Sequence, residues 1–147
     1  MTLIVEREVF IAAPPESVFE FLVDPLAMAR WFGERHLLDA RPGGTFRVAV
    51  SDGAVARGTY TEVVPHRRVV FSFGWEGRDD LPPGGSLVEI DLEPREEGTL
   101  LRLRHSGLPR DAAEPFTPEE HARRWAHHLS RLRQQAADHT SAERRKP

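Results

Sequence analysis

The sequence predicts an α+β fold in which a curved antiparallel sheet of six to seven strands packs around a long C-terminal helix. Three observations support this prediction. Apolar and polar residues alternate in consecutive segments separated by short turns, which is typical of antiparallel strands with one buried face. Two short helical patterns follow the first strand. Residues 118–136 carry an apolar stripe with helical spacing.

The composition fits one soluble globular domain. Of 147 residues, 39% are hydrophobic and 29% are charged. The net charge of −3 argues against a nucleic-acid partner, and the absence of cysteine excludes disulfides and thiolate chemistry. The N-terminus lacks the pattern of a signal peptide, and no apolar stretch approaches the roughly 20 residues of a membrane span. We therefore expect a cytoplasmic protein.

Residues 3–11 are predicted to form the first strand, because Val5, Val9 and Ile11 share one face and acidic residues lie on the other. Arg7 interrupts the apolar face. One explanation is an edge position or a shift in strand register. The other is a charge directed into an internal cavity.

Two short helices are predicted after this strand. Pro14 and Pro15 suit the start of the first helix. Its apolar stripe consists of Val18, Phe21 and Leu22. Asp24 is the expected N-cap of the second helix, Pro25 its first residue, and Gly33 ends this segment.

The segments that follow alternate with period two. The predicted strands cover residues 46–50, 55–64, 69–75, 88–92 and 101–105. Turn sequences such as Ser-Asp-Gly at residues 51–53 separate them, and a polar loop follows Trp75. These features predict an antiparallel meander.

The last predicted element is a helix that begins at a capping box of Thr117, Pro118 and Glu120. Its apolar stripe consists of Ala122, Trp125, Leu129, Leu132 and Ala136. Over residues 118–136 this helix is about 28 Å long, enough to cross a sheet. We expect the domain to cover residues 1–137, and residues 138–147 to form a disordered tail because they show no periodicity.

Several strings resemble one protein family in order and spacing. They are IAAPPESVFEFLVDPLAMARWF, DARPGGTFRV, GTYTEVVPHRRVVFSFGW, GTLLRLRHSGLP and the tryptophan of RRWAHHLSRL. They are similar, over about residues 5–132, to the family related to the activator of the heat-shock protein 90 ATPase, in the START-like (SRPBCC) superfamily. The order of elements likewise resembles the helix-grip fold of that superfamily.

The resemblance implies a cavity between the sheet and the long helix, where related proteins hold lipids, sterols or polyketides. It also implies a chaperone partner and a role in the stress response. The eukaryotic co-chaperone has an additional N-terminal domain, for which we expect no room in this chain. The family commonly has glycine where this sequence has Arg124. Helical spacing places position 124 off the apolar face, so we expect this difference to be tolerated.

The histidines of the long helix do not have the spacing of a metal site. His127 and His128 are adjacent and point about 100° apart, whereas His121 and His128 lie two turns apart, roughly 10 Å by the helix rise. Neither pair reaches one ion. We expect no metal and no cofactor, with His127 exposed and the other two histidines beside the apolar stripe.

His105 lies on the same predicted strand face as Leu101 and Leu103, which should point inward. It is either a hydrogen-bonded core histidine or a cavity group that offers a hydrogen bond or a proton to a ligand. No serine lies in a nucleophile-elbow motif. We therefore predict no catalytic residue, and His105 would be the acid–base group if the protein were an enzyme.

The leading hypothesis is a domain that binds a small apolar or aromatic molecule. The candidate ligand-binding residues are Trp31, Phe32, Phe46, Tyr60, Phe71, Phe73, Trp75, His105, His121, Trp125 and Leu129. His105, with Tyr60, Arg7 or His121, would orient the ligand. We expect a monomer or a weak dimer.

Two alternatives remain. One is a co-chaperone-like protein that contacts an acidic partner through Arg123, Arg124, Arg131 and Arg133 on the long helix. The other is a cyclase-like or hydrolase-like enzyme that uses His105. The size and lining of the cavity discriminate among these hypotheses, because a nearly closed, dry cleft favours a protein-interaction role.

Overall fold

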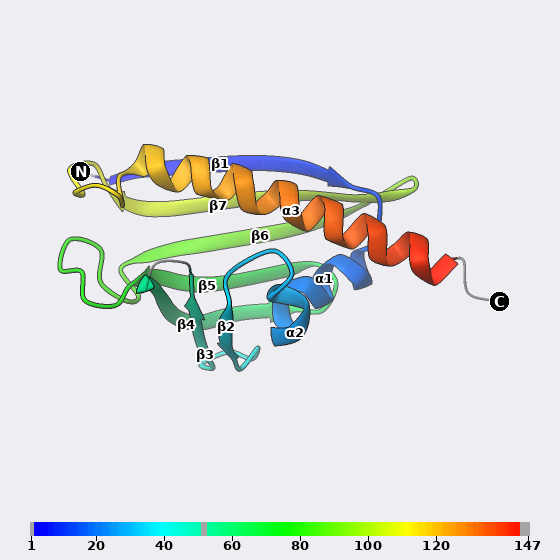
Figure 1. Ribbon diagram of the computed structural model, residues 1–147, viewed down its shortest axis with the longest axis horizontal. Helices are drawn as coiled ribbons and strands as arrows, with labels where there is room; N and C mark the ends of the chain where they lie inside the picture. The colour runs from blue at the N-terminus through cyan, green and yellow to red at the C-terminus, as the bar shows by residue number, and fades with distance from the viewer. Residues whose placement is uncertain (1, 51–52, 145–147) are drawn as a thin grey trace.

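The computed structural model describes residues 2–50 and 53–144. Within them, seven strands form one antiparallel sheet in the order β1-β7-β6-β5-β4-β3-β2 (Figure 1). The elements in chain order are β1 (Thr2–Ile11), α1 (Pro15–Val23), α2 (Pro25–Met28), β2 (Arg35–Leu38), β3 (Thr45–Ala49), β4 (Val55–Val64), β5 (Arg68–Trp75), β6 (Ser86–Arg95), β7 (Gly98–Pro109) and α3 (Pro118–Arg144). The predicted α+β class, with a curved sheet and a long C-terminal helix, is confirmed.

The helix α3 lies across one face of the sheet. Figure 1 shows its N-terminal half running along β1 and β7 and its C-terminal half reaching α1. At 27 residues it is about 40 Å long. No helix in the described part of the chain is long and apolar enough to cross a membrane.

The short helices form as their sequence predicts. The stripe of α1 is buried, and it consists of Val18, Phe21 and Leu22. The side chain of Asp24 caps α2 by accepting a hydrogen bond from the backbone N–H of Ala27 at 3.0 Å. Gly33 has a φ of +79°, a left-handed conformation that favours glycine and ends the segment.

Strand β2 was not predicted. It is a short edge strand that pairs only with β3, and none of its four residues is fully buried. Arg35 and Leu37 share one face of the strand and are both exposed, so polarity does not distinguish a buried face from an exposed one. Periodicity therefore cannot identify such a strand.

The predicted end of the long helix was wrong, since α3 continues to Arg144. The buried side of the helix extends from Leu132 through Ala136 to Thr140 with a spacing of four residues. Alanine and threonine give a weak apolar signal, which hid this continuation. Residues 145–147 of the predicted tail, and Ser51 and Asp52 of a predicted turn, lie outside the described residues.

Arg7 lies on an edge strand. β1 pairs only with β7, and their register shifts between Leu3 and Val5. The side chain is exposed, and its Nη2 donates to the carbonyl of Ala122 on α3 at 3.4 Å. The edge explanation is confirmed, because Arg7 lies on the outermost strand with its side chain exposed, in the lining of an open surface cleft.

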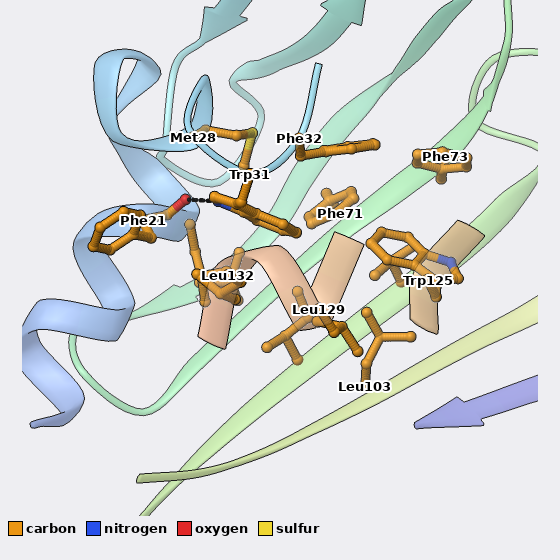
Figure 2. Close-up of a cluster of buried hydrophobic side chains, with 14 of the residues drawn as sticks. Phe21, Met28, Trp31, Phe32, Phe71, Phe73, Leu103, Trp125, Leu129 and Leu132 are labelled. Atoms are coloured by element: carbon orange, nitrogen blue, oxygen red, sulfur yellow. Dashed lines mark hydrogen bonds between the residues drawn. The ribbon is translucent and has the colours of Figure 1, made fainter. Parts of the chain in front are cut away.

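The core fills the space between the sheet and α3. Figure 2 shows Trp125, Leu129 and Leu132 of α3 packed among side chains from the strands, including Phe71 and Leu103. The core reaches the short helices through the indole N–H of Trp31. This N–H donates a hydrogen bond to the carbonyl of Phe21 at 2.8 Å, which Figure 2 shows as a dashed line. The stripe predicted for the long helix is therefore its packing face.

Replacing Leu132, which is fully buried on α3, tests this packing face. We expect Leu132→Ala to lower the free energy of unfolding by about 3 kcal/mol, because it removes buried methyl groups and leaves a cavity. Urea denaturation followed by circular dichroism measures the change. The exposed neighbour provides the control, and Arg133→Ala should change the stability by less than about 0.5 kcal/mol.

Candidate binding site

The candidate site lies where the first half of α3 crosses the sheet. Five predicted site residues meet there and form what we call the aromatic seam, namely Phe32, Phe73, Trp75, His121 and Trp125. They come from the segment after α2, from β5 and from α3. The free space between them is about 10 Å³, close to the smallest volume that holds one water molecule. The seam is thus closed.

The other predicted site residues lie deeper. Phe46 and Phe71 stack with their ring centroids 4.1 Å apart, and Tyr60 packs against both rings. The hydroxyl of Tyr60 donates to the carbonyl of Leu22 at 3.5 Å, and burial raises the pKa of this phenol. Trp31 and Leu129 likewise belong to the core. These residues support the seam from below.

His105 is a fully hydrogen-bonded core histidine. The indole N–H of Trp125 donates to its Nδ1 at 3.0 Å, so this nitrogen carries no proton. Its Nε2–H then donates to Ser86 Oγ at 2.7 Å, and the Ser86 hydroxyl donates to the carbonyl of Phe73 at 2.7 Å. Complete burial lowers the pKa of His105 well below its usual value. Both nitrogens are therefore occupied in the neutral ring.

His121 repeats this arrangement on α3. The indole N–H of Trp75 donates to its Nε2 at 3.0 Å, and its Nδ1–H donates to the carbonyl of Thr117 at 2.9 Å. Burial lowers the pKa of His121 too. Two indole donors and two neutral imidazoles thus join α3 to β5 and β7. The described residues contain no group of three or more His, Asp or Glu side chains that could hold a metal ion.

Arg124 corrects one expectation. We placed position 124 away from the packed face, but its guanidinium lies 4.9 Å from the ring centroid of Phe116 and 5.5 Å from that of Trp75. The side chain is half-buried and covers the seam. Its Nη1 is buried without a hydrogen-bond partner, and burial lowers the pKa of the guanidinium. Leaving such a donor unsatisfied costs roughly 1–3 kcal/mol.

Open clefts flank Arg124 on both sides. The larger has a volume of about 540 Å³, and its lining includes Trp75, Phe116, Val50 and Val55. The smaller has a volume of about 360 Å³ and lies beside His128 on α3. Both volumes lie in the range of small-molecule sites. The space inside the seam is therefore closed, whereas the two clefts beside Arg124, at the rim of the seam, are open.

Our reading of the sequence missed Arg124, His128 and Phe116 as parts of this site. A signal existed for the first two, because residues 121, 124, 125 and 128 follow the spacing i, i+3, i+4 and i+7 of one helix face. Arg124 and His128 lie beside the apolar stripe that defined this face, and of its flanking residues only His121 was predicted as a ligand-binding residue. No periodic signal marks Phe116, which precedes the helix. His127 is exposed, as predicted.

A family model described as activator of Hsp90 ATPase homolog 1-like protein matches residues 12–137. No curated protein matches the chain. An AHSA1-like protein from Rhizobium etli, solved in solution, is 45% identical, with 93% of this chain and 83% of that chain covered and a TM-score of 0.70.

Two further solved structures are similar. A Chromobacterium violaceum protein is 27% identical, with 91% of this chain and 96% of that chain covered and a TM-score of 0.77. The Aha1 dimer from Colwellia psychrerythraea is 18% identical, with 92% and 96% covered and a TM-score of 0.79. The latter likeness shows the fold alone.

The buried histidines make stability depend on pH. Burial, with a smaller effect of nearby His127, Arg124 and Arg131, lowers the pKa of His128 to about 4 from 6.5. Below pH 6.5 the imidazole of His128 therefore becomes protonated in the unfolded chain, whereas in the folded chain it stays neutral down to about pH 4. The full contribution of neutral His128 to the free energy of unfolding is present above pH 6.5. We expect protonation of the unfolded chain at this residue alone to lower the free energy of unfolding by about 3 kcal/mol as the pH falls to 4.

Urea denaturation at half-unit pH steps measures this loss. We expect His128→Gln to reduce the slope between pH 6.5 and 4, since glutamine donates to the same carbonyl of Trp31 without titrating. The matched control is His127→Gln at the exposed neighbour, which should change the slope much less because His127 makes only a small contribution to the lowered pKa of His128. Equal slopes for the wild type and His128→Gln would contradict the assignment.

Proposed function

The chain belongs to the family of activator of Hsp90 ATPase homolog 1-like proteins, and from this premise we propose that it binds a small apolar or aromatic molecule above the aromatic seam. The fold is one whose superfamily includes ligand-binding and polyketide cyclase-like members. The proposal follows from the aromatic seam and from the two clefts at its rim. It needs no metal and no cofactor.

The observation that carries the proposal is the cover of the seam. Arg124 lines the seam and lies over Trp75 and Phe116, and within the described part of the chain only ring contacts hold its guanidinium there. Contacts of this kind are worth about 0.5–2 kcal/mol. A ligand that enters a rim cleft and shifts the Arg124 side chain aside would rest on Trp75, which the guanidinium covers, with Arg124 still beside it. The seam would then open without moving a backbone element.

The apolar area sets the affinity that we expect. A ligand that buries about 150 Å² of apolar surface gains roughly 4 kcal/mol, which corresponds to a Kd of about 1 mM. Two or three fused rings would bind more tightly. His105 and His121 act indirectly in this proposal, because their hydrogen bonds hold the indoles of Trp125 and Trp75 in place. An acid–base role for His105 has no support from these bonds.

A titration of the three indole N–H signals tests the proposal. We expect flavonoids, polyketides or fused aromatic compounds at millimolar concentration to shift the signals of Trp75 and Trp125 in nitrogen–proton correlation spectra. The signal of Trp31, whose N–H is bonded to Phe21 below the seam, should shift less. If no compound in such a library moves the first two signals, the proposal fails.

A chaperone partner is the second candidate, and the closed seam favours it. A dry interior leaves the outer surface as the functional part, and α3 exposes Arg123, Arg131 and Arg133 there. In this case the arginines would contact an acidic surface of an Hsp90-type chaperone. Their side chains provide charge complementarity without any cavity.

An ATPase assay with the chaperone of the same cell tests this candidate. We expect stimulation at a molar excess of the protein, and we expect Arg133→Glu to weaken it because the reversed charge repels an acidic partner. The Leu26→Ser variant, at an exposed position away from the arginines, is the control. Absence of stimulation by the wild type at high excess would remove this candidate.

A further inference from the structure

We propose that the ligand is an aromatic carboxylate whose rings occupy the larger cleft and whose carboxylate pairs with Arg124. This inference rests on the proposed binding function and names the chemical class of the ligand. It depends on the surroundings of one guanidinium and on the lining of one cleft.

Arg124 differs from the other arginines of the two clefts. Arg78 pairs with Asp80 at 2.8 Å, Arg123 pairs with Glu120, and Arg131 donates to the carbonyl of Arg30 at 3.1 Å. Within the described residues, Arg124 makes neither an ion pair nor a hydrogen bond, and its Nη1 is buried. A half-buried cation without a counterion favours an anionic ligand.

Among the residues that the structure describes, the acidic side chains of the clefts do not neutralise this charge. Glu76 lines the larger cleft, but its carboxylate pairs with Arg47 at 2.8 Å and with Arg57 at 3.6 Å. Glu34 lines the smaller cleft and forms no ion pair with Arg124. The nearby imidazoles, His121 and His128, are neutral near pH 7 because burial lowers the pKa of each. The positive charge is therefore available to a ligand.

The larger cleft suits the aromatic part of such a ligand. Its apolar lining consists of Val50, Ala54, Val55, Trp75, Pro115 and Phe116. A volume of about 540 Å³ exceeds that of two fused rings, so the rings fit without displacing any backbone. Arg124 belongs to the lining of this cleft, with its guanidinium over the rings of Trp75 and Phe116. The edge of a guanidinium binds a carboxylate through two parallel hydrogen bonds.

A matched pair of probes separates charge from shape. We would titrate the wild type with 2-naphthoate and with 2-naphthamide at pH 7.5, and follow the indole signals of Trp75 and Trp125. The two probes have the same rings and nearly the same size, but only the first is an anion. We expect the wild type to bind 2-naphthoate about tenfold to 100-fold more tightly, the range typical of hydrogen bonds to a charged group.

Two variants locate the effect. Arg124→Met keeps an unbranched chain over the rings and removes the charge, so we expect it to bind both probes alike. Arg133→Met makes the same exchange at an exposed position outside the clefts, and it should keep the wild-type preference. Circular dichroism melting curves would check that both variants fold.

Each failure has its own signature. Equal affinity of the wild type for both probes, or a preference that survives in Arg124→Met, overturns the carboxylate inference and leaves the binding function intact. If neither probe moves the indole signals of the wild type at millimolar concentration, the carboxylate inference fails together with the binding function at this cleft.

Discussion

Two hydrogen bonds between buried indoles and buried imidazoles hold together the half of this molecule that contains the candidate site. Trp125 on α3 donates to His105 on β7, and Trp75 on β5 donates to His121 on α3. Each bond requires a neutral imidazole with one particular nitrogen unprotonated. The orientation of the rings of Trp75 and Trp125 follows from these two contacts, and so does the closure of the seam between α3 and the strands. Packing alone would place α3 on the sheet without fixing its rings.

Features that repeat along a single element could be predicted from the sequence. Alternation identified β3 through β7, and the stripe of Trp125, Leu129 and Leu132 identified the packed face of α3. The N-cap at Asp24 was predictable because a side chain and a backbone N–H three residues later form a local bond. Strand β2 and the last turns of α3 were missed since their residues show little contrast in polarity.

The site was less predictable because its bonds join distant parts of the chain. The histidine at position 105 and the tryptophan at position 125 are 20 residues apart, and no spacing rule connects a strand residue to a helix residue. The sequence could therefore place His105 inside without deciding whether its nitrogens were free. Arg124 was misjudged for another reason. A cation can lie on aromatic rings, so polarity alone does not assign a helical position to solvent.

The seam combines a rigid base with a cover that is held weakly. The base is fixed by hydrogen bonds between α3 and the strands, and separating them would break the core around Leu129. The cover is a single guanidinium held by ring contacts, with one donor unsatisfied. In the proposed binding mode, shifting this guanidinium would uncover Trp75 at a lower cost than moving the helix. A small cavity in the resting protein is therefore compatible with the proposed ligand binding, because a shift of the Arg124 side chain would enlarge the site while the backbone stays in place.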